Sequence, residues 1–395
     1  MKIVLGVTGG VAVYKMLGVV RQLQSDGHEI VVIMTPAAAK FVNPILFKTL
    51  SHNTVLTEDF DISRPIAHVE LADWADVYAV APATANTIAK IAHGIADNLL
   101  TTTALARTGR RIVFPSMNVH MYENPATQEN LCILSEKLGW EVVEPDSGSL
   151  ACGYSGKGRL VSEERIAAVI SRDPDAPLKG KKYIVTAGGT IEKIDPVRYI
   201  SNFSSGKMGI ETAKALYKKG ADVLLVYGNI TASVPSYIES VKIESAAELL
   251  DTLRRRLPLF DGVFMAAAVA DYAPSKQSQS KIKRHDDKIT LELTANPDVL
   301  KTAASENKGK LFVGFALETD DAEANAAKKL SAKGIDYIVL NRLGPEHNPL
   351  GADENSVRLI GKNGAAEESG LISKKEAAEW LVRRILIENP ARGAV

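Results

Sequence analysis

The sequence has few cysteines, no excess of either charge and no long hydrophobic run, and each absence excludes a class of protein. Its 395 residues include only Cys132 and Cys152, so a disulfide framework and a C-x-x-C metal site are excluded. Lys and Arg total 47 and Asp and Glu also total 47, so no bulk attraction to nucleic acid or to an anionic membrane is expected. No apolar run reaches the ~18 residues of a membrane span. We therefore expect a soluble, cytoplasmic protein with no nucleic-acid or membrane partner.

The first half repeats one pattern of short apolar runs, turn residues and helical stretches. The runs lie at residues 2–7, 29–34, 77–81 and 111–115, with a helical stretch at 11–25. Apolar runs that are too short for helices and do not alternate are typical of parallel strands covered on both faces. We predict a doubly wound α/β domain over residues 1–175, with ligands at the carboxyl ends of its strands.

The pattern stops at residues 171–180, which contain two prolines and predict an interdomain linker. It restarts with expected strands at 183–187, 222–226, 262–267, 310–315 and 336–340 and a helix at 207–219. Asn363-Gly364 predicts a terminal β-hairpin with a type I′ turn. Ser373 and Glu376 predict a capping box at the start of a closing helix. We predict a second, Rossmann-like α/β domain over residues 176–395.

Two loops of the first half carry candidate phosphate-binding groups. Thr8, Gly9 and Gly10 lie between the first strand and the first helix, where backbone N–H groups can approach a phosphate. The full G-x-G-x-x-G spacing and a later acidic ribose reader are missing, which favours a mononucleotide over a dinucleotide. A second loop follows another strand and offers further donors, although it could equally be a plain loop with an N-cap; its candidates are Pro82, Thr84, Asn86 and Thr87.

Four further side chains of the first half stand out. His68 precedes an alternating stretch, and a lone histidine of this kind is more often structural than functional. Asn118 follows a strand end, which suits a binding residue. Cys152 lies in a glycine-dense polar loop, whereas Cys132 has apolar neighbours and is expected in the core.

The most informative stretch is residues 188–209, which join a strand to a helix. Its length of roughly twenty residues exceeds the usual connection of about 2–6 and indicates a functional loop. At the helix start, an anion nest is formed by Ser204, Ser205, Gly206 and Lys207. Arg198 and Asn202 could contact an acyl or phosphate oxygen. The alternative to a functional loop is a glycine-rich turn whose lysine lies on the surface and binds no ligand.

Further along, Asp271 ends a strand, a position suited to binding a ribose, a base or Mg²⁺. Lys281 belongs to a basic cluster at 281–284, which in isolation is more often a solvated edge than a site.

The order of these motifs carries a resemblance. Four motifs of the first half resemble the decarboxylase half of a bifunctional family of coenzyme A synthesis, the phosphopantothenoylcysteine decarboxylase / phosphopantothenate-cysteine ligases. These motifs are HVELADWAD (68–76), PATANT (82–87), PSMN (115–118) and ACGYSGKGR (151–159). Five segments of the second half resemble the ligase half of the same family, so that the similarity runs from about residue 5 to 341. They are residues 188–209, AAAVADY (266–272), KIKR (281–284), GFALET (314–319) and K-L-x-x-K-x-x-D (329–336). Ser116 departs from the usual Ala, and Arg284 from the commoner Lys.

For the first half, the resemblance implies a flavodoxin-like fold that binds FMN. It assigns His68 as the active-site histidine, Asn118 as the residue that grips the substrate carboxylate, and Cys152 as an acid on a lid. Oxidation of the CH2–S carbon to a thioaldehyde would let the neighbouring carboxylate leave as CO2. The flavin reduced in the first step then returns a hydride to the enethiolate product, and a thiol such as Cys152 can supply the proton. Imidazole, with an ordinary pKa of about 6.5, suits proton transfer at the substrate thiol.

For the second half, the resemblance implies that CTP activates 4′-phosphopantothenate as an acyl-cytidylate, from which the amine of cysteine displaces CMP. Asn202 then steers the acyl-cytidylate and Arg198 acts in the second half-reaction. The residues implied around CTP are Asp271, Lys281, Phe315, Lys329 and Lys333, with Mg²⁺ near Asp271. The family also implies decarboxylase trimers and ligase dimers in a homo-dodecamer. The end product is 4′-phosphopantetheine.

Two other functions remain as alternatives. A nicotinamide-dependent oxidoreductase would need a complete glycine fingerprint and an acidic ribose reader, and neither half supplies them. A non-enzymatic FMN-binding scaffold would not need His68, Asn118 and Cys152 together. The bifunctional enzyme is therefore the preferred interpretation.

Overall fold

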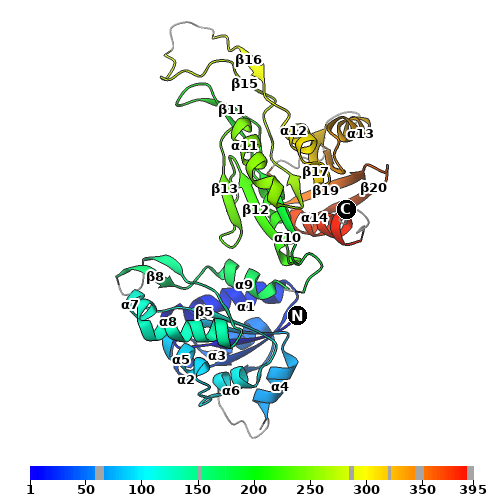
Figure 1. The fold of residues 1–395 in the computed structure, drawn as a ribbon. Coiled ribbons are helices and arrows are strands. Elements are labelled where there is room, and N and C mark those ends of the chain that lie inside the picture. The colour runs from blue at the N-terminus through cyan, green and yellow to red at the C-terminus, as the bar shows by residue number, and fades with distance from the viewer. Residues whose placement is uncertain are drawn as a thin grey trace. The chain divides into compact units, whose positions relative to one another are not determined.

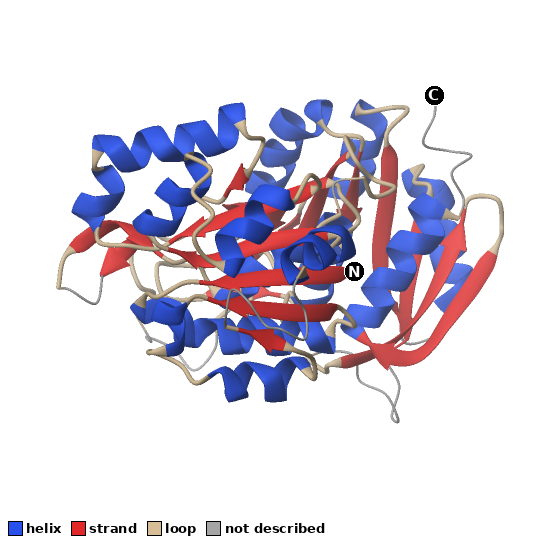
Figure 2. Ribbon diagram, turned by 90° about the horizontal axis from the view of Figure 1, so that it is seen from below, coloured by secondary structure: helices blue, strands red, loops and turns tan. Residues whose placement is uncertain are grey.

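The computed structural model describes residues 1–57, 66–149, 153–173, 175–283, 289–318, 322–342 and 351–388. Its contacts divide the chain into two compact units, Met1–Ser171 and Arg172–Val395. The division lies within the expected linker, a few residues before the predicted boundary. Each unit is an α/β structure, and Figures 1 and 2 show strands enclosed between helices.

The first unit is built on a six-stranded parallel sheet of order β3-β2-β1-β4-β5-β6. Its strands are β1 (Lys2–Val7), β2 (Glu29–Met34), β3 (Val55–Leu56), β4 (Val77–Ala83), β5 (Arg110–Pro115) and β6 (Glu141–Val142). The order reverses between β1 and β4, and such a switch point is where doubly wound sheets bind ligands. The doubly wound parallel sheet expected from the sequence is confirmed.

Alternating side chains of the strands enter two cores, one on each face of this sheet. Ile3 and Leu5 pack with one set of helices, while Val4 packs with the other. The first set is α1 (Met16–Ser25), α2 (Pro36–Ala39), α3 (Pro44–Ser51) and α9 (Glu163–Ser171). The second set is α4 (Ala67–Trp74), α5 (Ala85–Ala92), α6 (Leu99–Ala106), α7 (Val119–Glu123) and α8 (Pro125–Cys132). A short hairpin of β7 (Asp146–Ser149) and β8 (Ser155–Arg159) lies outside the main sheet.

The second unit has an eight-stranded sheet of order β13-β12-β9-β14-β17-β18-β19-β20, parallel except for its last two strands. Its strands are β9 (Lys182–Ala187), β12 (Asp222–Tyr227), β13 (Glu239–Lys242), β14 (Gly262–Met265), β17 (Leu311–Glu318), β18 (Tyr337–Arg342), β19 (Glu354–Gly361) and β20 (Ala366–Ser373). One face is covered by α10 (Lys207–Lys218) and α14 (Lys374–Val382). The other is covered by α11 (Ala246–Arg256), α12 (Val299–Glu306) and α13 (Ala322–Lys333). This confirms the Rossmann-like expectation.

Two small antiparallel pairs of the second unit were not expected. The segment between β9 and α10 contains β10 (Ile191–Lys193) paired with β11 (Tyr199–Ser201). A second pair consists of β15 (Tyr272–Pro274) and β16 (Leu293–Ala295), and β15 contacts β10. Figure 1 shows β11, β15 and β16 together beyond the main sheet. The long connection predicted from the sequence is therefore structured. We call the described residues of the segments 191–201 and 272–295 the arm.

The terminal elements show where local sequence signals hold and where they fail. Ser373 caps α14 with Glu376 in the expected capping box. The hairpin of β19 and β20 is also present, but only Gly364 of its turn has a positive φ, at 80°. A type I′ turn needs two such residues, so the predicted turn type is wrong. Cys132, expected in the core, is exposed at the end of α8, because its apolar neighbours occupy other faces of the helix.

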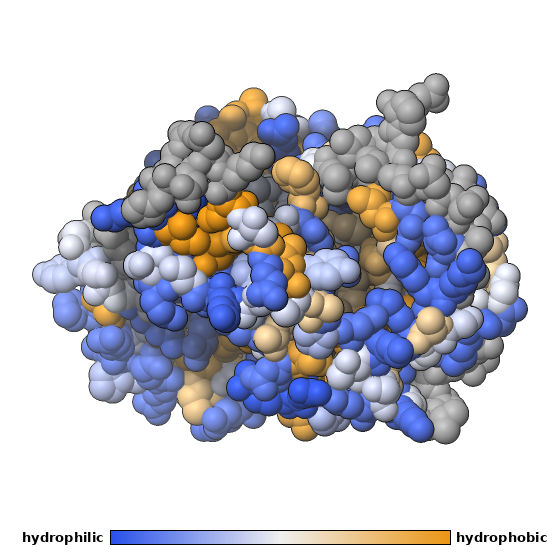
Figure 3. Space-filling view, turned by 90° about the horizontal axis from the view of Figure 1, so that it is seen from above, coloured by the Kyte–Doolittle hydropathy of each residue, from blue (hydrophilic) through white to orange (hydrophobic). Residues whose placement is uncertain are grey.

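Apolar side chains also reach the surface of both units. Figure 3 shows hydrophobic patches among hydrophilic side chains on the face drawn there. In the first unit Val11, Tyr14 and Ile45 are each more than half exposed, and in the arm Val197 and Tyr272 are as well. None of the described helices combines the length and hydropathy that a membrane span requires.

Candidate active sites

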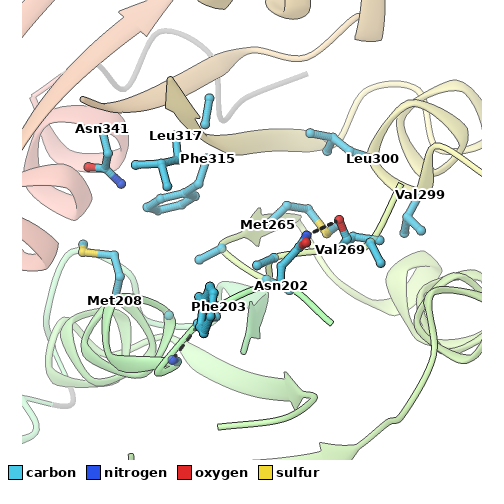
Figure 4. A pocket seen from close by; sticks show the side chains of 18 of the residues that line it. Asn202, Phe203, Met208, Met265, Val269, Val299, Leu300, Phe315, Leu317 and Asn341 are labelled. Atoms are coloured by element: carbon cyan, nitrogen blue, oxygen red, sulfur yellow. Dashed lines mark hydrogen bonds between the residues drawn. The ribbon is translucent and has the colours of Figure 1, made fainter. Parts of the chain in front are cut away.

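A cavity of about 580 Å³ opens at the carboxyl ends of the second unit's parallel strands. It lies at the switch point between β9 and β14, as expected for a doubly wound sheet. Figure 4 shows Phe315 and Asn341 on one side of it and Phe203 and Met208 on the other. Its walls come from four parts of the chain, namely residues 202–209, 265–271, 296–300 and 315–317, together with Lys329, Lys333, Asn341, Gly351, Asn355 and Lys374.

One wall is the N-terminus of α10, which glycine makes possible. Gly206 has φ of 79°, and a Cβ there would lie 2.4 Å from Cγ2 of Ile230. The N-cap residue of this helix, Gly206, has no side chain that could accept a hydrogen bond from the first N–H groups. Ser204 and Ser205 accept only long hydrogen bonds of 3.4 Å from the N–H groups of Gly206 and Lys207. The residues predicted to form an anion nest, 204–207, thus line the cavity at the start of α10.

Four lysines line the cavity, and three of them bind the following carboxylates. Lys207 donates to Asp353 Oδ1 at 2.7 Å and to the carbonyl of Gly351 at 3.0 Å. The others are Lys329 with Glu318 at 2.6 Å and Lys333 with Asp298 at 2.9 Å.

The fourth lysine, Lys374, is only 6% exposed. Burial, with a further contribution from Lys207, lowers the pKa of Lys374 below its ordinary value. An anion in the cavity would favour the charged form of this side chain.

Two asparagines tie the walls of the cavity together. Asn202 Nδ2 donates to the carbonyl of Val269 at 3.0 Å, which Figure 4 shows as a dashed line. Asn296 Nδ2 donates to the carbonyl of Ala270, and the N–H of Asn296 to the carbonyl of Asp271, both at 2.8 Å. Asp271 is thereby held at the edge of the cavity, where the sequence places a ribose, base or metal contact.

Part of this cavity is lined by residues that the sequence did not predict. Residues 296–300, Asn341, Asn355 and Lys374 were not among the candidates. Asn-Pro-Asp at 296–298 is a turn signal that precedes a helix, and Asp298 caps α12, so this segment could have been found. Asn355 is 1% exposed, and its buried Oδ1 has no hydrogen-bond partner among the described residues. It comes from the antiparallel β19 and has no local sequence signal.

Arg198 and Lys281 do not line the cavity of their own unit. The guanidinium of Arg198 binds the carboxylate of Asp195 and the carbonyl of Ile282 instead. These contacts place Arg198 and Lys281 together in the arm.

In the first unit, the two candidate loops meet at the switch point between β1 and β4. The hydroxyl of Thr8, which is 1% exposed, donates to the carbonyl of Pro82 at 2.6 Å and accepts from the N–H of Thr84 at 3.1 Å. Thr84 in turn caps α5 by accepting from the N–H of Thr87. Thr8 therefore holds the two loops together rather than presenting a free hydroxyl.

The glycines of the first loop differ in their surroundings. A Cβ on Gly9 would lie 2.5 Å from Cβ of Ala37, so the loop approaches α2 too closely for a side chain. The nearest contact of a Cβ on Gly10 would be Thr84 at 3.7 Å. Asn86 is exposed on the first turn of α5. The backbone near Gly10 and α5 can therefore approach a phosphate.

The three catalytic candidates of the first unit lie on separate elements. His68 lies in α4, a helix rather than an alternating segment, and is half-buried. Asn118 caps α7, with Oδ1 accepting from the N–H of His120 at 2.8 Å. Cys152 is outside the described residues, but β8, which follows it, packs beside Asn118, because Met117 N–H donates to the carbonyl of Gly158 at 3.0 Å. The structure thus joins the PSMN loop to the hairpin that carries Cys152.

Among the described residues, no group of three or more His, Cys, Asp or Glu side chains is arranged to hold a metal ion. Asp271 has no such companions there. A divalent cation at Asp271 would therefore need most of its ligands from a bound substrate or water.

Comparisons with known proteins agree with this division. Residues 1–173 match the family described as "Flavoprotein", and residues 178–387 match "DNA/pantothenate metabolism flavoprotein C-terminal domain". The "Coenzyme A biosynthesis bifunctional protein CoaBC" of Bacillus subtilis (strain 168) is 41% identical over 97% of this chain and 96% of that protein. A "Cysteine/Cysteine sulfinic acid decarboxylase" from an unknown prokaryotic organism is 42% identical over 87% of this chain and 99% of that protein.

A solved structure of the C-terminal domain of a coenzyme A biosynthesis bifunctional protein CoaBC covers 53% of this chain and 96% of its own. It is 36% identical, with a TM-score of 0.46. The two family matches and the full-length relative describe the same succession of a flavoprotein unit and a pantothenate-metabolism unit. The chain belongs to the family of bifunctional coenzyme A biosynthesis enzymes.

Proposed function

We propose that the second unit couples 4′-phosphopantothenate to cysteine with CTP, and that the first unit decarboxylates the product to 4′-phosphopantetheine with FMN. The observation that carries the ligase assignment is a cavity bordered by an uncapped helix N-terminus and four lysines. This arrangement favours a triphosphate, because N–H groups and ammonium groups both stabilise phosphate oxygens.

The ligase residues fall into groups with distinct tasks. Ser204, Ser205, Gly206 and Lys207 bind phosphate oxygens, and Lys329, Lys333 and Lys374 neutralise the charge that develops as pyrophosphate leaves. Phe315 lies in the opposite wall, where its ring can contact the nucleoside. Asp271 binds the ribose or the metal.

Asn202 acts at the reacting carboxylate. Its Nδ2 is held by Val269, which fixes the amide plane at the cavity wall. The carboxylate oxygen attacks the α-phosphorus of CTP and pyrophosphate leaves, giving the acyl-cytidylate. The amine of cysteine then attacks the acyl carbon, CMP leaves, and the amide forms with loss of one proton. We assign Mg²⁺ mainly to the triphosphate, because Asp271 lacks neighbouring metal ligands in the part of the chain that is described.

In the first unit, the residues at the switch point fit FMN. Thr8, Gly9 and Gly10 approach Pro82, Thr84, Asn86 and Thr87 there, and the start of α5 and the glycine loop offer N–H groups to a phosphate. FMN, when bound, would supply an acceptor for the electron pair removed from the CH2–S carbon and, once reduced, the donor that returns this pair after CO2 has left.

The protein supplies the remaining groups for decarboxylation. His68 accepts or holds the proton of the substrate thiol, Asn118 holds the departing carboxylate, and Cys152 donates a proton to the product. Packing of β8 beside the Asn118 loop supports an arrangement in which Cys152 closes over the bound substrate.

We also propose that the enzyme is a cytoplasmic homo-oligomer, a dodecamer of decarboxylase trimers and ligase dimers. Exposed apolar side chains on both units favour self-association. Lys281 lies outside the cavity of its own unit, which supports its action in the cavity of a second copy. With equal numbers of basic and acidic residues, the chain offers no reason to add a nucleic-acid or membrane partner.

A two-step assay tests this function. The purified protein is mixed with 4′-phosphopantothenate, CTP and Mg²⁺, and pyrophosphate is measured before and after cysteine is added. We expect release before cysteine is added, and 4′-phosphopantetheine by mass spectrometry after it. Asn202→Asp should abolish or stall amide formation, and an unchanged rate would reject the role of Asn202. Free cysteine, tested as the alternative substrate of the first unit, separates this function from that of the relative named for cysteine decarboxylation.

A further inference from the structure

A buried carboxylate lies at the base of the arm. Asp195, in the turn between β10 and β11, is 1% exposed. Its Oδ1 accepts from the N–H groups of Val197 and Arg198, each at 2.8 Å, and its Oδ2 accepts from Arg198 Nε at 3.0 Å. These hydrogen bonds, above all those from the Arg198 side chain, hold the pKa of Asp195 well below its usual range. The Asp195–Arg198 pair is therefore ionised at neutral pH.

The pair forms hydrogen bonds to a segment distant in sequence, residues 276–283, which we call the strap. Asp195 Oδ2 accepts from the N–H of Ile282 at 3.1 Å, and Arg198 Nη2 donates to the carbonyl of Ile282 at 2.7 Å. A third bond joins the N–H of Ser278 to the carbonyl of Ile194 at 2.9 Å. Both main-chain polar groups of Ile282 are thus bound, while Lys281 beside it is exposed.

We infer that Asp195 is a positioning residue of the ligase reaction, acting through Arg198 to fix the strap that presents Lys281. This inference rests on the proposed function. The described part of the strap has no helix or strand, so holding it in one conformation costs conformational entropy. Hydrogen bonds from an ionised pair whose carboxylate is buried offset that cost before substrate binds, which is how a supporting residue pre-organises a site. Arg198, seen from the sequence as a contact to substrate oxygens, is here first a link between Asp195 and the strap.

The test compares Asp195→Asn with wild type in the full-length protein. The asparagine side chain keeps the shape of aspartate, but it has no charge and has an NH2 group in place of one carboxylate oxygen. It therefore cannot accept all the hydrogen bonds that Arg198 and the N–H of Ile282 donate to Asp195. We expect at least a tenfold fall in kcat/KM for amide formation and faster tryptic cleavage after Lys281 or Lys283, located by mass spectrometry. Decarboxylation of supplied phosphopantothenoylcysteine should be unchanged, because the first unit does not contain the pair.

Asp251→Asn is the matched control. It removes an exposed carboxylate that pairs with Arg255 at 3.0 Å on α11. This variant should retain wild-type activity and tryptic protection. If Asp195→Asn does not fold, Arg198→Lys replaces it, because a lysine keeps the charge but cannot bind Asp195 through a planar fork while reaching Ile282. The same losses are expected for Arg198→Lys.

A double-mutant cycle separates positioning from a general structural effect. If Asp195 acts through Lys281, then Asp195→Asn combined with Lys281→Gln will be no slower than Lys281→Gln alone. Losses that multiply, or wild-type activity and strap protection in Asp195→Asn, would overturn the inference. If wild-type protein releases no pyrophosphate from CTP, the proposed function fails instead, and tryptic protection still reports whether Asp195 holds the strap.

Discussion

Replacing Thr8 with valine tests how the flavin site of the first unit is built. Valine keeps nearly the same volume but removes the hydroxyl that joins the carbonyl of Pro82 to the N–H of Thr84. A buried polar group without a partner costs about 1–3 kcal/mol. The Pro82 carbonyl is in the buried end of β4, whereas Thr84 is half-buried and can recover part of its loss with water. We therefore expect a destabilisation of about 2–4 kcal/mol in total.

The assay follows release of FMN by its fluorescence during urea unfolding, because this signal reports on the first unit alone. Thr8→Val should lower the midpoint of the transition and weaken FMN binding about tenfold or more, since a change of about 1.4 kcal/mol corresponds to a factor of ten. Thr8→Ser keeps the hydroxyl and loses one buried methyl, at a cost of about 1 kcal/mol. If Thr8→Val matches Thr8→Ser in both stability and FMN affinity, the two hydrogen bonds do not hold the loops and this reasoning fails.

Three other predictions concern charge and proton transfer. Lys374→Gln should raise the KM for CTP about tenfold, because a charged hydrogen bond is worth about 1.5–3 kcal/mol, while decarboxylation is unaffected; an unchanged KM would remove Lys374 from the triphosphate site. Cys152→Ser should still release CO2 but accumulate the unreduced product, detected by mass, and normal turnover would contradict its role as the acid. The pKa of Asp195 is lower in the folded protein than in the unfolded chain, where it is about 3.9. The hydrogen bonds of the Asp195 carboxylate therefore contribute fully to stability above pH ~3.9, and this contribution is lost as the pH falls through the lower, folded-state pKa. Hydrogen exchange of the Ile282 amide should therefore show constant protection factors from pH 7 to pH 5, and a loss within that range would place the pKa higher.

Much of the architecture was predictable because both units repeat strands that are buried on two faces. Such strands are continuous apolar runs, so β1 and β2 were found with their bounds. Helix capping could also be predicted from the local sequence, as the capping box of Ser373 and Glu376 shows. The two doubly wound α/β folds follow from these repeated signals, whereas the flavodoxin-like assignment of the first unit came from the family resemblance.

The arm was not predictable by the same means. Strands β10 and β15 have three residues each, too few for a hydrophobic period to appear. The Asp195–Ile282 contact joins residues far apart in the sequence, and no local signal reports it. His68 was placed in an alternating stretch, but α4 is a short helix in which tertiary packing decides the conformation.

The candidate sites divide in the same way. Loops that follow strands were found because the sheet brings carboxyl ends together, as it does for Asn202 and Asp271. Asn355 was missed because it lies on the antiparallel strand β19, and Lys374 was missed because it is the first residue of α14, so neither follows the carboxyl end of a parallel strand. Thr8 was found, but its role as a buried link could not be separated from a ligand contact without the structure.

The most direct test of the central claim is mass spectrometry of one reaction that contains the purified protein, 4′-phosphopantothenate, cysteine, CTP and Mg²⁺. The account predicts a product with the mass of 4′-phosphopantetheine, formed only when CTP is present and with one CO2 released per molecule. Absence of that product from protein that retains bound flavin, or its formation without any nucleoside triphosphate, would contradict the assignment of the two units.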